Sequence, residues 1–186
     1  MDAGDVIRVD NPSRTYLFGD PHFDHTNIIK YCNRPFKSVE EMNEVILRNW
    51  HRTIRSTDLV FFLGDMAFGR GSRKPRWWLS QLTGRIVYLK GSHDQGIRPA
   101  ATGLNALKVA LTQIVEFSNS KRVLLVHDTV NVPWTWLGWV IHGHNHNNRP
   151  LVDVHSQHVN VSADVLNYTP ISFSELFDKV RRAKDD

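Results

Sequence analysis

The stretch "DLVFFLGD", residues 58–65, decides how this chain folds. Its five central residues are apolar, and a Gly followed by an Asp ends the run. Such a run is typical of a β-strand that is buried on both faces and carries polar residues at its carboxyl end. Runs of the same form recur along the chain, at residues 15–20, 85–91, 122–128, 138–144 and 158–164. The sequence therefore predicts six such strands.

Helices are predicted between the first two strands and after the last one. Segments 38–55 and 172–184 each open with a Ser and a Glu three positions apart, the pattern of a capping box, and continue with apolar residues at helical spacing. Strands that alternate with helices indicate an α/β domain with a mixed sheet or two packed sheets. The segment 95–111 has no clear periodicity, and we expect an irregular excursion near the site.

The composition is that of a globular protein. With 186 residues, 41% hydrophobic and 23% charged, the chain fits one domain over residues 1–186. Its longest purely apolar run, Leu59 to Leu63, is far too short to span a bilayer, and the first ten residues lack the layout of a signal peptide. We therefore expect a cytoplasmic protein that does not bind membranes.

The charge and the cysteine content restrict the ligands. A net charge of +4 and a pI near 9.4 favour acidic partners, including phosphate-bearing ligands. A single cysteine, Cys32, supplies neither an intramolecular disulfide nor a thiolate-rich zinc site, so any metal must be held by His, Asp, Glu or Asn.

The densest basic run is "RGSRKPRWW", residues 70–78. Its basic residues followed by two tryptophans suit a surface that tracks a nucleic-acid backbone and stacks bases. The alternative, which is the commoner arrangement, is a solvated loop that leads into a helix whose tryptophans face the core.

Polar residues with metal-binding chemistry follow the predicted strands. They are Asp20, His22, Asp65, Ser92, His93, Asp94, His127, Asp128, His142, His144 and His146. Because ligands bind at the carboxyl ends of strands in α/β sheets, we expect these side chains to converge. Carboxylates and imidazoles without thiolates suit Mn²⁺, Zn²⁺, Fe or Ni²⁺. The set exceeds the four ligands that one Zn²⁺ needs, which favours two metals about 3.5–4 Å apart with a bridging carboxylate.

The motifs "GDPHFDH", "GDMAFG", "GSHD", "VHD" and "HGHNH", in that order, resemble the five-motif signature of the calcineurin-like metallophosphoesterase superfamily. The resemblance extends from about residue 16 to about residue 168. The short chain, with "NIIKYCNRPF" at 27–36 and "NVSADVLNYTPIS" at 160–172, is most similar to the small stand-alone bacterial, archaeal and phage members. The resemblance implies an α/β fold, a four-layer α/β/β/α sandwich of two mixed β-sheets.

The same resemblance implies a binuclear metal centre and a mechanism. Asp20, His22 and His146 would hold the first metal, His127 and His144 the second, and Asp65 would bridge the two. Two divalent ions are implied, with Mn²⁺ expected first and Zn²⁺, Fe, Ni²⁺ or Mg²⁺ as alternatives. A metal-activated hydroxide would attack phosphorus. His93 would protonate the leaving oxygen, and Asp94 would hold the ring of His93.

The chain departs from the family pattern at Ser92. Family members have Asn there, and its amide oxygen binds the second metal. A serine hydroxyl is shorter and a poorer ligand, so we expect a weaker or partly occupied second site. A Ser-His-Asp nucleophile relay at 92–94 is disfavoured because such triads are assembled from residues that lie apart in sequence.

Further residues are candidates for the surroundings of the metals. The side chains expected to contact substrate phosphate are His25, Asn27, Arg34 and Arg70. The alternative for His25 is to support the metal ligands. His142 is expected to lie behind the ligands and orient them.

The sequence thus predicts a metal-dependent phosphoester hydrolase. Diesters are favoured over monoesters, and a small diester or a nucleotide is the expected substrate. The segment "GDMAFGRG" lacks the second Asp of the Ser/Thr protein phosphatase motif, which argues against that branch. The alternatives are a non-catalytic scaffold with a degenerate second metal site and a nuclease that uses residues 70–78 to bind nucleic acid.

Overall fold

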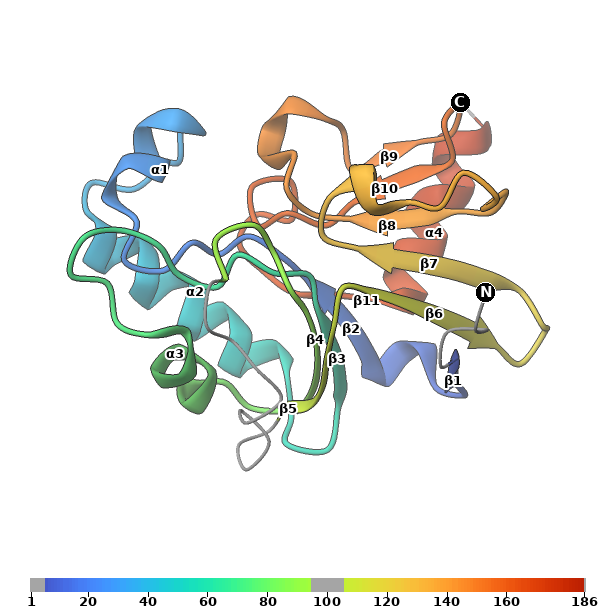
Figure 1. Ribbon diagram of the computed structural model, residues 1–186, viewed down its shortest axis with the longest axis horizontal. Helices are drawn as coiled ribbons and strands as arrows, with labels where there is room; N and C mark the ends of the chain where they lie inside the picture. Colours follow the sequence, from blue (N-terminus) through green and yellow to red (C-terminus); the bar gives the residue numbers. More distant parts are fainter. Residues whose placement is uncertain (1–5, 95–105, 186) are drawn as a thin grey trace.

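The computed structural model describes residues 6–94 and 106–185, and these form two β-sheets with helices around them (Figure 1). The five-stranded sheet has the order β11-β2-β3-β4-β5 and the six-stranded sheet the order β1-β6-β7-β8-β10-β9. Each sheet contains both parallel and antiparallel pairs. The expected α/β architecture of two mixed sheets is therefore confirmed.

The strands are short, and their bounds are as follows. The five-stranded sheet contains β11 (Ile171–Ser172), β2 (Thr15–Phe18), β3 (Leu59–Phe62), β4 (Arg85–Leu89) and β5 (Ala106–Ala110). The six-stranded sheet contains β1 (Val6–Val9), β6 (Thr112–Phe117), β7 (Arg122–Val126), β8 (Val140–His142), β10 (His158–Asn160) and β9 (Val152–Asp153).

Helices flank the two sheets. They are α1 (Thr26–Tyr31), α2 (Val39–Thr53), α3 (Pro75–Gln81) and α4 (Phe173–Asp185), with short 3-10 turns η1 (Pro12–Arg14), η3 (Thr129–Asn131) and η4 (His146–Asn148). In Figure 1, α2 and α3 lie beside the five-stranded sheet, and α4 lies on the side of the six-stranded sheet. This order matches the predicted four-layer sandwich.

Aromatic side chains join the layers. Trp50 of α2 is 1% exposed, and its ring lies 6.0 Å from that of Phe18 and 6.3 Å from that of Phe62. On the other side, Phe173 at the start of α4 contacts Phe61 of β3 and Phe117 of β6, so one side chain touches both sheets. Burying a large apolar side chain contributes about 1.5–3 kcal/mol, so these contacts hold helices and sheets together.

The two predicted capping boxes form, with one difference. Ser172 and Glu175 exchange two hydrogen bonds. The Ser172 hydroxyl accepts the Glu175 N–H at 3.2 Å, and the Ser172 N–H donates to the Glu175 carboxylate at 3.0 Å. Ser38 accepts the N–H of Glu41 at 3.2 Å, but the Glu41 carboxylate accepts the N–H of residue 37 instead. Both helices therefore begin where the sequence predicts.

All six predicted strands are present, and other elements were missed. Residues 106–110 form β5, so the expected irregular excursion is wrong for that part, while residues 95–105 lie outside the described residues. Strand β6 begins two positions after β5 ends, which is why the boundary is hard to see in sequence. The segment "RGSRKPRWW" leads into helix α3, as its second interpretation predicts. Trp78 faces the core and is 2% exposed, as that interpretation expects, but Trp77 is 42% exposed.

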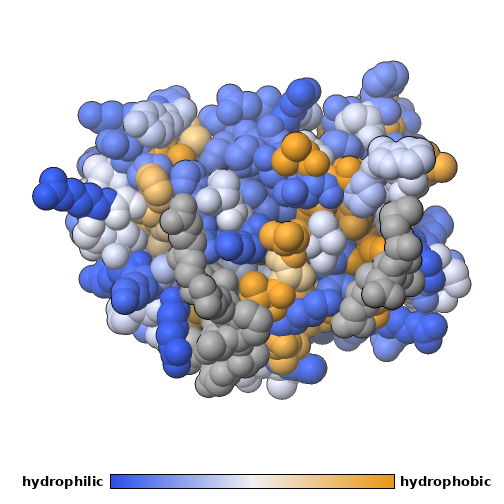
Figure 2. Space-filling view, in the orientation of Figure 1, coloured by the Kyte–Doolittle hydropathy of each residue, from blue (hydrophilic) through white to orange (hydrophobic). Residues whose placement is uncertain are grey.

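The surface is mostly hydrophilic. The face in Figure 2 is interrupted by hydrophobic residues near β5 and β6, and Leu107 and Leu111 are exposed large apolar side chains of this region. Within residues 6–94 and 106–185, no helix has the length and apolar character that crossing a membrane requires.

Candidate metal centre

The site is built from loops that follow parallel strands. Strands β2, β3 and β4 are neighbours and run parallel, so the loops that carry Asp20, Asp65 and His93 leave the sheet at one edge. Strands β7 and β8 are also parallel, and the loops that carry His127 and His144 follow them. A hydrogen bond from the His127 ring to the Leu63 carbonyl connects the two sheets there.

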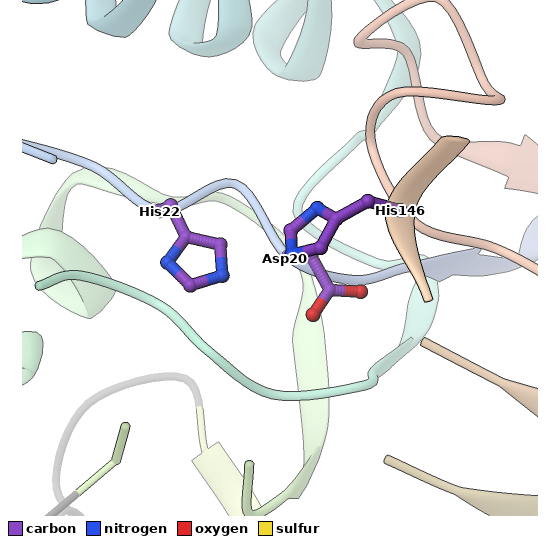
Figure 3. A group of neighbouring side chains, drawn as sticks. All are labelled: Asp20, His22 and His146. Atoms are coloured by element: carbon purple, nitrogen blue, oxygen red, sulfur yellow. The ribbon is translucent and has the colours of Figure 1, made fainter. Parts of the chain in front are cut away.

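The first group of potential ligands comprises Asp20, His22 and His146. Each offers one ligand atom, and these atoms lie within 4.8 Å of one another. Figure 3 shows the three side chains, which come from two well-separated parts of the chain, gathered around one space. Asp20 is 0% exposed and His22 is 2% exposed, so this group is shielded from water.

The second group comprises Asp65, His127 and His144, again with ligand atoms within 4.8 Å of one another. Atom Oδ2 of Asp65 lies 3.4 Å from Nε2 of His127 and 3.5 Å from Nε2 of His22. This carboxylate oxygen therefore lies between a member of each group, as a bridging ligand requires.

The backbone at these residues is strained. Asp20, His22, Asp65, His144 and His146 have φ angles between +48° and +65°, in the left-handed region that residues other than Gly rarely adopt. Such conformations cost about 1–3 kcal/mol each and persist where the surrounding structure holds them. The surrounding structure therefore holds five of these candidate residues in a costly backbone conformation.

The imidazoles are oriented from behind. The Nδ1 atom of His127 donates to the Leu63 carbonyl at 2.7 Å, and Nδ1 of His146 donates to the Asp164 carboxylate at 2.8 Å. A donor at Nδ1 leaves Nε2 with a free lone pair directed into the site. At His22, Nδ1 lies 3.3 Å from Nδ1 of His25, which again leaves Nε2 for a ligand.

The unpaired atoms of the site fit a cation. Asp20 Oδ1, His22 Nε2 and His127 Nε2 are buried side-chain atoms that have no hydrogen-bond partner among the residues the structure describes. Each unsatisfied buried polar atom costs about 1–3 kcal/mol, and a divalent ion would satisfy all three atom types. Carboxylate oxygens with imidazole nitrogens are a donor set for Mn²⁺, Zn²⁺, Fe or Ni²⁺.

The pKa values reflect buried negative charge. Burial raises the pKa of Asp20 above its ordinary value. Burial acts in the same direction on Asp65, but the nearby imidazole of His127, with Nε2 3.4 Å from Asp65 Oδ2, holds the pKa of Asp65 well below its usual range. Burial lowers the pKa of an imidazole, yet Asp65 and Asp20 raise that of His127 to about 9 and Asp164 raises that of His146 to about 10.

The carboxylate of Asp94 binds backbone N–H groups, whereas the sequence led us to expect that it holds the ring of His93. Its carboxylate accepts the N–H groups of Asp65 at 2.8 Å, Met66 at 3.0 Å and Gly91 at 2.8 Å. With both oxygens directed at backbone amides of two loops, Asp94 fixes the position of Asp65 rather than the ring of His93.

Ser92 and His93 both contact the Asp65 carboxylate. The Ser92 hydroxyl donates to Asp65 Oδ2 at 3.3 Å, and the His93 backbone N–H donates to Asp65 Oδ1 at 2.8 Å. Atom Nε2 of His93 lies 4.0 Å from Asp65 Oδ2, and the His93 side chain is 38% exposed. His93 thus lies between the ligand groups and solvent, and the Ser92 hydroxyl is directed at Asp65 rather than into a nucleophile relay.

Arg34 does not contact substrate, so this expectation is wrong. The residue is 4% exposed, and its Nε and one terminal nitrogen donate to Asp164 at 2.9 and 3.0 Å. The terminal nitrogens also donate to the carbonyls of Asp20 at 2.9 Å and Pro21 at 2.7 Å and to the sulfur of Met42 at 3.3 Å. All five N–H groups are therefore used inside the protein, and none is left for a phosphate.

Asp164 is the residue that the sequence undervalued. It was not among the predicted site residues, yet it connects the Arg34 guanidinium to the His146 ring. The signal for its role was present, because Asp164 ends the last predicted strand run as Asp20 and Asp65 end theirs.

The other candidates lie around the centre. His25 is buried and bonds to His22, as the supporting alternative for it predicts. Asn27 is exposed on α1, and Arg70 is exposed on the loop before α3. His142 is 2% exposed, and its ring bonds to the carbonyl of the next residue, behind the two ligand groups.

Two motif glycines make room for the carboxylates. A Cβ atom at Gly91 would overlap the Asp65 carboxylate and its backbone N–H, and one at Gly143 would overlap the Asp20 carboxylate. The Gly of "GSHD" and the Gly of "IHGH" are thus required by the close approach of the two acidic side chains.

Fold and site together define the class of protein, a two-sheet α/β protein with two groups of Asp and His side chains at the ends of its strands. No family model matches the chain. The uncharacterised protein MJ1445 of Methanocaldococcus jannaschii is 35% identical over 176 residues, which cover 92% of this chain and 93% of that protein. The chain therefore belongs to the same family as MJ1445.

A solved structure shares the fold. The protein of unknown function AQ665 from Aquifex aeolicus superposes with a TM-score of 0.67 at 24% identity, over 89% of this chain and 98% of that one. A novel archaeal phosphodiesterase gives a TM-score of 0.46 at 14% identity, over 80% of this chain and 81% of that one, a likeness from which we infer nothing.

Proposed function

We propose that this protein is a metal-dependent phosphoester hydrolase that prefers phosphodiesters to phosphomonoesters. The observation that carries the proposal is the position of Asp65 Oδ2, 3.4 Å from Nε2 of His127 and 3.5 Å from Nε2 of His22. One carboxylate oxygen between two buried imidazoles, one from each group, suits the donor arrangement of a two-metal hydrolytic centre.

The ligand roles follow the two groups. Asp20, His22 and His146 would hold one divalent ion, His127 and His144 would hold the other, and Asp65 would serve both. When bound, the ions supply Lewis-acid activation of water and neutralise charge on the phosphate oxygens. We expect Mn²⁺ first, with Zn²⁺, Fe, Ni²⁺ or Mg²⁺ as alternatives.

His93 supplies the proton for the leaving group. Its ring lies at the mouth of the centre, 4.0 Å from the Asp65 carboxylate and partly open to solvent, where a departing alkoxide would need a proton. Asp94 contributes by holding the loop of Asp65. Its role is therefore to position a ligand and not to orient the His93 ring.

The second ion is held more weakly than the first. Ser92 stands where family members have Asn, and the Ser92 hydroxyl bonds to Asp65. The group of His127 and His144 is then left without the amide ligand, and the His144 side chain is 41% exposed, which favours loss of this ion.

Metal analysis combined with turnover tests the proposal. Purified protein is freed of metal, reloaded with each divalent ion, and assayed with bis(p-nitrophenyl) phosphate and p-nitrophenyl phosphate. We expect two bound ions at saturation and faster turnover of the diester. Asp65→Asn should lower metal affinity and turnover by more than about 100-fold, whereas the surface control Asp178→Asn should change neither.

Each alternative gives a different result. Bound metal without turnover of either ester would establish a non-catalytic scaffold. Protein that binds no divalent ion, or that keeps its turnover in Asp65→Asn, would overturn the hydrolase.

A further inference from the structure

We propose that a depression beside His93 binds a nucleoside and a further phosphate of the substrate, so that the substrate class is a nucleotide-bearing phosphodiester with a second phosphate group. The depression has a volume of about 320 Å³ and is lined by residues of the segment 67–75 together with His93. This inference rests on the proposed function, and it names the substrate class of that same site.

The depression has two free cations. Arg70 and Lys74 both line it and both are exposed. Within residues 6–94 and 106–185, neither side chain makes an ion pair or a side-chain hydrogen bond. Exposed cations at the edge of an active site suit a phosphate, because a guanidinium and an ammonium both form charge-assisted bonds to its oxygens.

The third cation of the segment, Arg73, is used to hold the depression in place. Its guanidinium contacts the Asp24 carboxylate at 3.4 Å and lies 4.5 Å from the ring centroid of Trp77. Asp24 also accepts the backbone N–H of Arg73 at 2.8 Å and the indole N–H of Trp78 at 3.1 Å. Since Asp24 follows the ligand His22 by two positions, the segment is fastened to the loop of the first metal group.

An aromatic ring lies beside the proton donor in the same depression. The ring of Phe68 packs against that of His93, with centroids 4.2 Å apart, and against that of His25 at 4.9 Å. Phe68 is nevertheless 42% exposed and lines the depression. An exposed aromatic ring held by its neighbours is a platform on which a nucleobase stacks.

The contacts of these groups suggest how the substrate lies. His93 Nε2 is 4.0 Å from the Asp65 carboxylate, the His93 ring packs against Phe68, and His93 and Phe68 line the depression together with Arg70 and Lys74. A phosphodiester at the metal ligands would place its leaving nucleoside near His93 and Phe68 and its next phosphate near the cations. A small synthetic diester reaches only the first of these groups.

Substrate pairs that differ by one phosphate test this assignment. The rate constant kcat/KM is measured for the dinucleotide ApA and for the same dinucleotide with a 5′- or a 3′-terminal phosphate. We expect one phosphorylated form to exceed ApA by about tenfold, the effect of a single charge-assisted contact. In Arg70→Ala and Lys74→Ala the ratio of kcat/KM between the phosphorylated dinucleotide and ApA should fall toward one. Arg76 is an exposed neighbour outside the depression, so the control Arg76→Ala should keep the ratio of the wild type.

Binding without metal gives a second readout that does not depend on turnover. Adenosine 3′,5′-bisphosphate is titrated into metal-free protein, and its affinity is compared between wild type, Lys74→Ala, Phe68→Ala and Arg76→Ala. We expect about tenfold weaker binding of the bisphosphate in Lys74→Ala and in Phe68→Ala, and no change in Arg76→Ala. Binding to the wild type should weaken at higher salt.

The outcomes separate the two proposals. Bisphosphate binding that depends on Lys74 and Phe68, without turnover of any diester, would refute the hydrolase and support the subsite. Turnover of bis(p-nitrophenyl) phosphate without a preference for a terminal phosphate would keep the hydrolase and overturn the subsite. An equal loss in Arg76→Ala would also overturn it, because net charge alone would then explain the effect.

Discussion

Atom Oδ2 of Asp164 lies 2.8 Å from Nδ1 of His146, and the same carboxylate receives two hydrogen bonds from the Arg34 guanidinium. A carboxylate behind a metal-binding imidazole fixes the tautomer and the direction of the ring. The geometry of the first ligand group therefore depends on a buried ion pair between residues 130 positions apart.

Asp164→Asn should weaken binding of the first metal by about 10–100-fold, because an amide orients the His146 ring less strongly than a carboxylate. Metal affinity is measured by calorimetric titration with Mn²⁺, and thermal unfolding is followed in parallel. Asp153→Asn, an acidic residue away from the site, is the control. A variant that loses stability but binds Mn²⁺ as tightly as the wild type would contradict the positioning role.

Arg34→Ala should destabilise the protein by about 3–5 kcal/mol, since it leaves the Asp164 carboxylate buried without its cation. The free energy of unfolding is obtained from urea titration. Arg181→Ala removes an exposed pair with Asp178 and should cost less than about 0.5 kcal/mol. A stable Arg34→Ala protein with only a raised KM would restore the phosphate-contact role that the burial of Arg34 argues against.

Ser92→Asn should increase affinity for the second metal, because it supplies the amide oxygen that the family pattern has at this position. The number of bound ions and both affinities are measured at limiting Mn²⁺. Ser92→Ala, which removes the hydroxyl without adding a ligand, serves as the comparison and should not gain affinity. Unchanged or lower affinity in Ser92→Asn would show that Ser92 lies too far from the ion for this explanation.

Metal affinity should rise with pH. Their carboxylate partners raise the pKa of His127 to about 9 and that of His146 to about 10. In the metal-free protein at neutral pH both rings are therefore imidazolium ions, with a proton on each nitrogen. A metal must displace the proton on Nε2 of each ring. For each proton released, the apparent metal affinity rises about tenfold per pH unit as long as the pH is below the pKa of that ring. Calorimetry in buffers of different ionisation enthalpy counts the protons, and binding without proton release would contradict the expectation.

Sequence alone was sufficient where the signal is local. The six strand runs, the two capping boxes and the Asp and His residues at the strand ends are visible because each depends on neighbours within a few positions. The convergence of these Asp and His residues follows from the same reasoning, since the carboxyl ends of parallel strands meet at one edge, and their division into two ligand groups was implied by the resemblance of the five motifs. The short elements β1, β6 and α1 were missed because four to six residues carry too little periodicity.

Partners that are distant in sequence were decided only by the tertiary structure. Nothing near Arg34 indicates Asp164, and nothing near Asp94 shows that its carboxylate holds the backbone of Asp65 instead of the ring of its neighbour His93. Which polar group satisfies a buried charge depends on where the folded chain brings donors and acceptors together. The sequence by itself determined which residues bind metal in our proposal, and the folded structure determined which residues hold them.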